Sequence, residues 1–319
     1  MTASVTAPYP ILDISSDQVI GDEQLGTKPK FWFDHDGARW LFKEAREIEA
    51  PSGNEYAGED WAEKVAAEMA SVLSIPAAEV ELATFQGRRG CASKRFTTSS
   101  KQLMHGNEIL AGHVENYDPG HDRTKWYRQS DHTLENIILA VRGMFKKKPE
   151  NRVVLTQLAS YLVLDALIGN VDRHHENWGL LWQVVVDHDD FLETSRVTKE
   201  YTVAPSYDHA SSLGRELLDQ KRIEKMRNKT VETYVRKGHG GIYKVGGKRG
   251  ENPLGLVESA AAEYADYFMP TLDRLRCIPL ERLTTTVDLV PDTRISAPAR
   301  SFAKAMLGVA YQSLTRIGT

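Results

Sequence analysis

The stretch GNVDRHHENWGLL, residues 169–181, gathers charged and amide side chains between two apolar segments. The run LASYLVLDALIGN before it predicts a buried helix that ends at Gly169, a common helix stop. The run WGLLWQVVV after it predicts a strand. Three interpretations compete for the charged loop between them: a solvated turn, a metal site, or a catalytic loop that holds a proton acceptor and a cation ligand at fixed spacing.

Upstream of this loop the chain is rich in strand patterns. PKFWFDHDGARWLFKEA (29–45) holds two aromatic runs around Asp36-Gly37, which predicts a β-hairpin. Residues 60–73 have apolar side chains at helical spacing and are followed by Pro76. AEVELATFQGRRGCASKRFTT (78–98) predicts a second hairpin, with QGRRG as its turn.

Downstream, two strands are expected around a polar turn up to about residue 204, and mostly helices after about residue 216. The fold class predicted is therefore α+β, in two lobes: a small strand-rich lobe and a larger, mainly helical lobe. We expect an N-lobe over residues 1–100 and a C-lobe over residues 101–319, with the binding site in the cleft between them.

Composition excludes several classes of protein. The chain has 319 residues, 41% of them hydrophobic, which is enough to bury a substantial core. A net charge of −4 gives no overall attraction to nucleic acid or anionic lipid. Two cysteines are too few for a disulfide framework, and the N-terminus has no signal-peptide pattern. The most apolar run, LASYLVLDALIGN, is interrupted by Asp165 and is shorter than the roughly 20 residues that a membrane-spanning helix needs. We therefore expect a cytoplasmic protein that binds neither membrane nor nucleic acid directly.

Asp172 and Asn177 lie five positions apart, the D-x-x-x-x-N spacing of a phosphotransfer loop. In that chemistry the aspartate accepts a hydroxyl proton, and the asparagine oxygen holds Mg²⁺ against the phosphates of ATP. A second oxygen ligand is expected after the next strand pair, where APSYDHASSLG (204–214) supplies Asp208. Asp208 could instead cap a helix, and Asp172 and Asn177 could simply form a turn.

A lysine that contacts the phosphates completes this set. Lys43 follows the alternation of Trp40 and Phe42 and is expected on the opposite face of its strand. Such a lysine needs an acidic partner. The following helix offers Glu63 and Glu68, and the apolar pattern alone does not decide between them.

The two motifs that carry Asp172, Asn177 and Asp208 resemble those of a known family. IGNVDRHHENWGLL followed by APSYDHASSLG is similar to the HipA family of bacterial serine/threonine kinases, over about residues 24–280. The resemblance implies that Glu63 is the partner of Lys43. It also implies that LGTKPKFWF covers the nucleotide phosphates and that KRFTT forms the adenine-side hinge, which adds five candidate nucleotide-binding residues: Gly26, Thr27, Lys30, Arg95 and Phe96. Thr27 is then a candidate for autophosphorylation.

Two features depart from the family pattern. Full-length members carry an additional N-terminal subdomain, whereas only about twenty residues precede the expected phosphate loop, so the chain looks like a shortened, stand-alone form. The family has a single histidine at this point of the loop, whereas this chain has two, His174 and His175. The second histidine is assigned no role.

The resemblance implies a two-lobed, protein-kinase-like fold and an ATP- and Mg²⁺-dependent kinase acting on Ser/Thr hydroxyls of a protein. It also allows for a toxin–antitoxin setting with an antitoxin protein as partner. A lipid kinase is the main alternative, but HASSLGRELLDQKR (209–222) is mixed in charge where an anionic head group would favour a basic cluster. A catalytically silent nucleotide-binding module is the second alternative. DRHHE with residues 187–190 lacks transition-metal spacing, and the glycine-rich loop 236–253 lacks the P-loop pattern.

Overall fold

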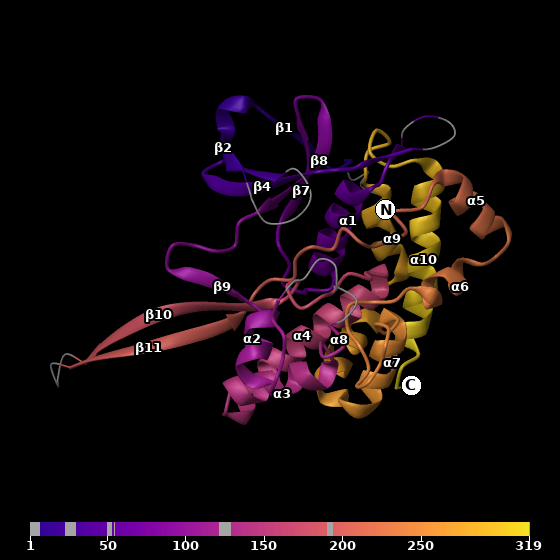
Figure 1. Cartoon of the computed structure of the whole chain (residues 1–319). Coiled ribbons are helices and arrows are strands. Elements are labelled where there is room, and N and C mark those ends of the chain that lie inside the picture. The colour runs from indigo at the N-terminus through magenta and orange to yellow at the C-terminus, as the bar shows by residue number, and fades with distance from the viewer. Residues whose placement is uncertain are drawn as a thin grey trace.

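The strand-rich part of the molecule is built on one curled, six-stranded sheet (Figure 1). The fold is taken from a computed structural model, which describes residues 7–22, 30–49, 53, 55–120, 129–189 and 194–318. The strand order is β1-β7-β8-β4-β3-β2, with β1 parallel to β7 and the other pairs antiparallel. The strands are β1 (Ile11–Ile14), β2 (Val19–Asp22), β3 (Lys30–His35), β4 (Ala38–Glu44), β7 (Val80–Phe85) and β8 (Arg88–Lys94). A 3₁₀ turn, Ser16–Gln18, and a small ribbon of β5 (Glu47–Ile48) and β6 (Glu55–Tyr56) accompany the sheet.

Two-residue turns fix the register of both hairpins. Asp36 and Gly37 have φ values of 49° and 70°, and Gln86 and Gly87 have φ values of 49° and 78°. Two successive positive φ angles match the twist of the flanking strands, which is why these residues suit tight hairpins. The first turn is where the sequence predicts it. The second is shorter than the predicted QGRRG, because Arg88–Lys94 already forms β8.

Helix α1 (Glu59–Val72) connects the sheet to the helical part. Trp61, Val65 and Met69 recur at helical spacing and are buried, as the sequence predicts. The helix packs against β7 and β8 on one side and against α4 and α9 on the other. The hydrophobic core of the helical part therefore extends into α1, while a second, smaller cluster of aromatic residues fills the other face of the sheet.

The helical part surrounds α4 (Lys148–Ile168), which ends at Gly169 in the left-handed conformation. The helices that accompany it are α2 (Gly106–His113), α3 (Leu134–Met144), α5 (Asp219–Arg227), α6 (Val231–Lys237), α7 (Pro253–Glu263), α8 (Ala265–Arg276), α9 (Leu280–Asp288) and α10 (Ala297–Thr315). With 21 residues, α4 is long and apolar enough to cross a membrane, so the sequence argument from length was wrong. However, 72% of its most apolar window is buried within the protein, where it serves as the central core helix.

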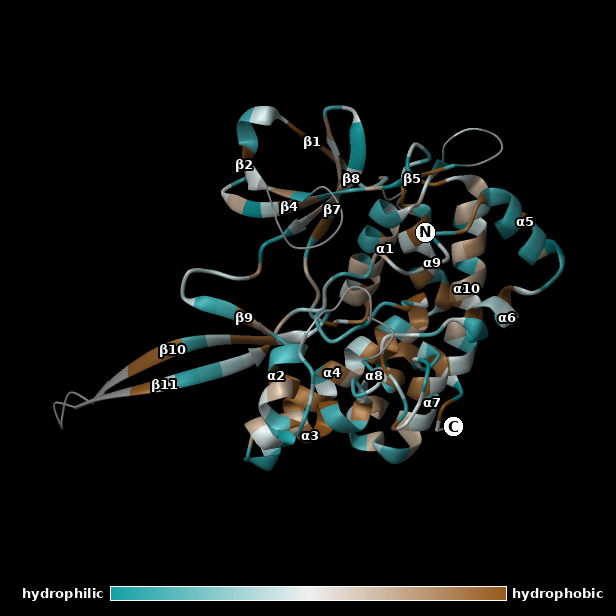
Figure 2. Ribbon diagram, in the orientation of Figure 1, coloured by the Kyte–Doolittle hydropathy of each residue, from teal (hydrophilic) through white to brown (hydrophobic). Residues whose placement is uncertain are grey.

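A second, three-stranded sheet lies at the junction and extends outward. Its order is β11-β10-β9, formed by β9 (Lys101–His105), β10 (Gly179–Asp189) and β11 (Thr194–Val203). Strand β9 pairs with the first five residues of β10, Gly179–Gln183, and the remainder of β10 projects with β11 as a two-stranded arm (Figure 1). Figure 2 shows a hydrophobic stretch along β10 on this arm, where Val184 and Val186 are about half exposed.

These elements confirm the prediction of an α+β fold with a strand-rich part followed by a mainly helical part. The division into domains at residue 100 stays a prediction.

Candidate active site

Lys43 lies late in β4, on the face of the sheet that looks toward the helical part. Trp40 and Phe42 on the same strand are buried in the small aromatic cluster, so the alternation of the strand sends Lys43 to the opposite side. Its Nζ is 2.9 Å from Oδ1 of Asp208, a residue 165 positions later in the chain. One ion pair thus joins the strand-rich part to the segment that follows β11.

The charges of this pair stabilise each other strongly. Burial lowers the pKa of Lys43, but the carboxylates of Asp208 and Glu63 outweigh burial and hold that pKa above its ordinary value. In turn, Lys43 holds the pKa of Asp208 well below its usual range. Asp208 also has a φ of 60°, a backbone conformation that is uncommon for a residue with a side chain. Such conformations cluster at functional sites.

Lys30 lies directly opposite Lys43, across the β3–β4 pair. Opposed residues of antiparallel strands place their side chains on the same face, so two lysines share this face of the sheet. Lys30 also contributes to the lowered pKa of Asp208. Two neighbouring amines beside one carboxylate form a region suited to a polyanion.

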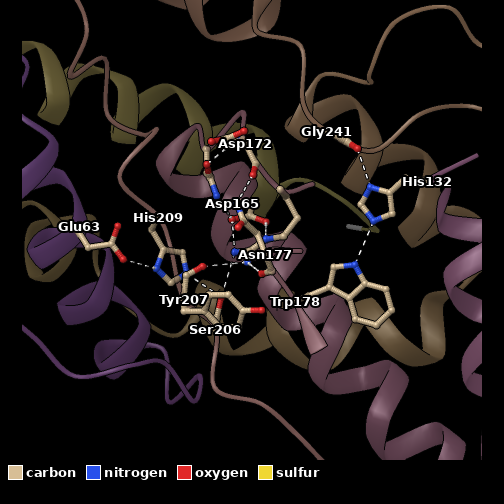
Figure 3. Close-up of polar contacts among 12 residues, drawn as sticks. Glu63, His132, Asp165, Asp172, Asn177, Trp178, Ser206, Tyr207, His209 and Gly241 are labelled. Atoms are coloured by element: carbon tan, nitrogen blue, oxygen red, sulfur yellow. Dashed lines mark hydrogen bonds and ion pairs between the residues drawn. The ribbon is translucent and has the colours of Figure 1, made fainter. Parts of the chain in front are cut away.

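The charged loop of residues 169–181 is fixed by its own hydrogen bonds (Figure 3). Asn177 Nδ2 donates to the main-chain oxygen of Asp172 at 2.5 Å, and the main-chain nitrogen of Asp172 donates to Asn170 Oδ1 at 3.1 Å. The amide nitrogen of Asn177 is therefore engaged inside the loop, and its oxygen is the atom of that group suited to a cation. The side chain of Asn177 is buried, whereas that of Asp172 is exposed.

Asp172 and Asp208 are close enough to influence each other's charge. The surrounding protein partly desolvates the Asp172 carboxylate and raises its pKa, and the charge of Asp208 raises it further, whereas His174 and Arg215 lower it. Ser211 Oγ donates to Asp172 Oδ2 at 3.5 Å. The structure thus brings Lys43, Asp172, Asn177 and Asp208 to one region.

Glu63 of α1 points toward the same region and is 1% exposed. Its Oε1 lies 3.7 Å from Nδ1 of His209, while its Oε2 is buried with no hydrogen-bond partner among the described residues. Although burial alone would raise its pKa, Lys43 and His209 hold the pKa of Glu63 below its ordinary value. Glu68, the alternative, pairs with Lys64 at 2.7 Å instead. Of the two glutamates, Glu63 is the one whose charge acts on Lys43.

Arg173 organises the floor of the site, a role that the sequence analysis missed. It is buried and donates to Asp165 of α4 with Nε at 2.7 Å and Nη2 at 2.8 Å. The same guanidinium donates to Ser206 Oγ at 3.0 Å and to the main-chain oxygens of Asn177 and Tyr207. It therefore holds together the backbone segments that carry both candidate metal ligands. The signal was Asp165 itself, since a carboxylate within a buried apolar helix requires a partner.

A second buried contact connects the glycine-rich loop 236–253 to the charged loop (Figure 3). Trp178 Nε1 donates to His132 Nε2 at 3.1 Å, and His132 Nδ1 lies 2.7 Å from the main-chain oxygen of Gly241. These partners require the neutral tautomer with hydrogen on Nδ1. Burial lowers the pKa of His132 to about 3, in agreement with a neutral ring. A Cβ on Gly241 would lie 2.7 Å from the main-chain oxygen of Arg173, so only glycine allows this approach.

The second histidine of the loop is also accounted for. His175 is fully buried, with Nδ1 2.9 Å from the hydroxyl of Tyr117 and Nε2 2.7 Å from Nε2 of Gln129. Its contacts anchor the loop to the segment after α2, so it has a structural role.

The remaining predicted residues lie in the connection after β8 or outside the residues that the structure describes. Arg95 and Phe96 follow β8 in the connection to β9, and the main-chain nitrogen of Arg95 donates to the oxygen of Arg39 at 2.8 Å. That nitrogen is thus used by the protein itself, while the ring of Phe96 lies 5.6 Å from that of Tyr207. Gly26 and Thr27 lie outside the described residues.

The donor set fits Mg²⁺ and a polyphosphate. Asn177 and Asp208 supply oxygen atoms, which Mg²⁺ prefers, and a cation near them would relieve the repulsion between Asp172 and Asp208. The orphaned Oε2 of Glu63 is an acceptor that Lys43 could use once Asp208 is engaged elsewhere. Among the residues that the structure describes, no cluster of three or more His, Cys, Asp or Glu side chains is arranged for a metal.

Known proteins resemble this chain in sequence and in fold. The serine/threonine-protein kinase CtkA of Helicobacter pylori (strain J99 / ATCC 700824) is 28% identical over 153 residues, which are 48% of this chain and 40% of CtkA. The crystal structure of a Helicobacter pylori proinflammatory kinase CtkA superposes with a TM-score of 0.75 at 18% identity, over 97% of this chain and 99% of that one. A complex of the Shewanella oneidensis MR-1 toxin–antitoxin proteins HipA and HipB with operator DNA gives a TM-score of 0.49 at 11% identity, over 97% of this chain and 67% of that one.

The solved CtkA structure establishes the kinase-type fold, and the sequence match spans less than half of the curated relative. A model of the HipA-like C-terminal domain matches residues 24–263, three quarters of the chain and all the described residues discussed above from Lys30 to Gly241. The chain therefore belongs to the family of HipA-like C-terminal domains.

Proposed function

We propose that this protein is an ATP- and Mg²⁺-dependent kinase that phosphorylates Ser or Thr hydroxyls of a protein substrate. The observation that carries the proposal is the convergence of Lys43 from the sheet with Asp208 and the loop of Asp172 and Asn177. Membership of a family related to kinases supports the reaction class.

Each residue has a role in this proposal. Asp172 is the base that accepts the proton of the attacking hydroxyl; it is exposed, as a group that must meet a second substrate should be. Asn177 and Asp208 would hold the metal ion. Lys43 would contact the phosphates, with Glu63 as its carboxylate partner.

Most of the catalytic effect would come from positioning and charge. Bound Mg²⁺ supplies neutralisation of the charge on the phosphates. Arg173 fixes the backbone of Asn177 and of Tyr207, next to Asp208, so both ligands are held before any substrate binds. The raised pKa of Asp172 makes it a better proton acceptor than an ordinary aspartate.

Five further residues would contact the nucleotide in this proposal. Gly26, Thr27 and Lys30 would cover the phosphates, and the position of Lys30 beside Lys43 supports the last of these. Arg95 and Phe96 would flank the adenine. Because the main-chain nitrogen of Arg95 is already bonded to Arg39, we expect the base to contact the segment through Phe96. Thr27 stays a candidate for autophosphorylation.

We further propose a cytoplasmic setting, in which an antitoxin protein is a candidate partner. The free thiols of Cys91 and Cys277 agree with a reducing compartment. The solved HipA complex contains HipB and operator DNA. In this chain no direct contact with nucleic acid is expected, because the net charge is −4.

The test is transfer of labelled γ-phosphate from ATP in the presence of Mg²⁺, with mapping of the labelled Ser or Thr residues. The Asp172→Asn variant should transfer phosphate roughly 10²–10⁴-fold more slowly, because a base is lost, and should still bind Mg²⁺–ATP. Equal labelling by both proteins would remove Asp172 from the role of base. Binding of ATP without any transfer would favour a silent module, and activity with Zn²⁺ but not with Mg²⁺ would contradict the proposed ligand set.

A further inference from the structure

A cavity of about 230 Å³ lies beside the charged loop, within the helical part. Its walls come from the end of α4, the segment after Asp208, α6, the start of α7 and α10. Lys43, Glu63, Asn177 and Asp208 do not line it. The cavity is therefore separate from the side of the site that we assign to the nucleotide.

The cavity begins within one residue of the proposed base. Val171, which directly precedes Asp172, lines it and is 38% exposed, so its side chain is accessible to an occupant of the cavity. Ser211 also lines the cavity, and its hydroxyl reaches Asp172 Oδ2. The main-chain nitrogen of Val171 donates to the oxygen of Ser211 at 3.2 Å, which ties these two walls together. A group in the cavity would thus lie next to a group at Asp172.

The chemistry of the cavity favours an apolar occupant with solvent at its entrance. Val235, Leu254 and Met306 are buried and contribute apolar surface, while Glu216 and Lys237 on the lining are exposed. The volume is below the roughly 300–1,000 Å³ typical of small-molecule sites. It suits one amino-acid side chain better than a cofactor.

Hydrogen bonds of one side chain, Asn252, connect the walls of the cavity. Asn252 Nδ2 donates to the main-chain oxygens of Val235 and Gly238 at 2.8 and 3.0 Å. Its Oδ1 accepts from the main-chain nitrogens of Leu254 and Gly255, which caps α7. One side chain therefore fixes the end of α6, the glycine-rich loop and the start of α7. The cavity is preformed, which limits the entropy lost when a side chain enters it.

We propose that this cavity receives an apolar side chain that neighbours the phosphorylated Ser or Thr in a polypeptide substrate. The inference rests on the proposed function and assigns to it a sequence preference. Consecutive Cα atoms are about 3.8 Å apart, so when the acceptor hydroxyl is at Asp172, residues one or two positions away are those that reach Val171. Differences of one methylene in an apolar pocket change selectivity roughly 10–200-fold, enough for a measurable preference.

The experiment uses the full chain, Mg²⁺–ATP and a positional-scanning library of peptides with a fixed central Ser or Thr. For the wild type we expect a preference of about 10-fold for Leu, Ile, Val or Met over Ser or Gly at one position within two residues of the acceptor. In Val171→Asp this preference should disappear or turn toward Lys and Arg. In Val235→Ala, farther from the base, the enlarged cavity should shift the preference toward larger side chains.

Val184→Asp is the matched control, since Val184 is 51% exposed on the β10–β11 arm and does not line the cavity. It should leave the profile unchanged. ATP turnover that depends on Asp172 is measured in parallel for every variant. With that turnover present, a flat profile at all flanking positions, or one that is the same in the wild type and both cavity variants, overturns the assignment. If the wild type shows no ATP turnover that depends on Asp172, the proposed function is overturned, and the assignment of the cavity with it.

Discussion

Two ion pairs in the same site differ in how much solvent they retain. The side chains of Arg173 and Asp165 are 5% and 3% exposed, whereas those of Lys43 and Asp208 are 18% and 40% exposed. The first pair has additional hydrogen bonds to three backbone or side-chain oxygens and is fixed by folding. The second joins two parts of the molecule with a single contact. The first pair builds the site, whereas in the proposed function the second pair is exchanged for a ligand.

The largest effect on stability is expected at the buried pair. Arg173→Met leaves the carboxylate of Asp165 buried without its cation, which costs about 3–5 kcal/mol of the free energy of unfolding. Denaturant unfolding measures this cost. Lys304→Met is the control, because its partner Asp288 is 44% exposed and such surface pairs contribute about 0–1 kcal/mol. A cost for Arg173→Met no larger than that of the control would refute its structural role.

The exchangeable pair should show the reverse pattern. Lys43→Met removes the cation beside Asp208 and buried Glu63, but Asp208 stays accessible to water, so the free energy of unfolding should fall by less than it does in Arg173→Met. Phosphate transfer should nevertheless fall roughly 10²–10³-fold, the typical cost of removing one group that stabilises transition-state charge. Lys94→Met, on the neighbouring strand β8 and paired with exposed Glu79, should change neither quantity appreciably. Destabilisation by Lys43→Met as large as that by Arg173→Met would contradict the difference between the two ion pairs.

The effect that is smallest at neutral pH concerns His132, which connects the glycine-rich loop to Trp178. Its pKa in the folded protein is about 3, below the ordinary value of 6.5. Between these values the unfolded chain binds a proton that the folded protein excludes, so stability falls as the pH decreases through this window. The contribution is about 1.4 kcal/mol per pH unit. His132→Gln should therefore show a shallower loss of stability between pH 6 and pH 4.

The control for this titration is His113→Gln, because His113 is exposed. It should reproduce the wild-type dependence on pH. Parallel curves for the wild type and His132→Gln would contradict the neutral, buried assignment of His132.

The contrast between the two pairs also explains what the sequence could reveal. The spacing of Asp172 and Asn177, the position of Asp208 after a strand pair and the alternation around Lys43 are local patterns, and from them a site with these four residues could be predicted. The α+β order of elements was predictable for the same reason, since hairpin turns and helical periodicity are local. The choice of Glu63 over Glu68 required the family resemblance, because both glutamates occur on one amphipathic helix.

What could not be predicted depends on contacts between distant residues. His132 meets Trp178 across 46 positions and Gly241 across 109, and nothing near His132 in the sequence indicates either partner. Asp165 was visible as a charge in an apolar run, but only the fold shows that Arg173 neutralises it. The cavity beside Val171 likewise arises from five separate segments, and no single stretch of sequence encodes it.

The most direct measurement is a crystal structure of the protein with Mg²⁺ and a non-hydrolysable ATP analogue. We predict one Mg²⁺ ion bound by the side-chain oxygen of Asn177 and the carboxylate of Asp208, at roughly 2.0–2.1 Å. Lys43 should then have left Asp208 for the phosphates. A metal ion bound elsewhere, with the 2.9 Å contact between Lys43 and Asp208 intact, would contradict the assignment of this site.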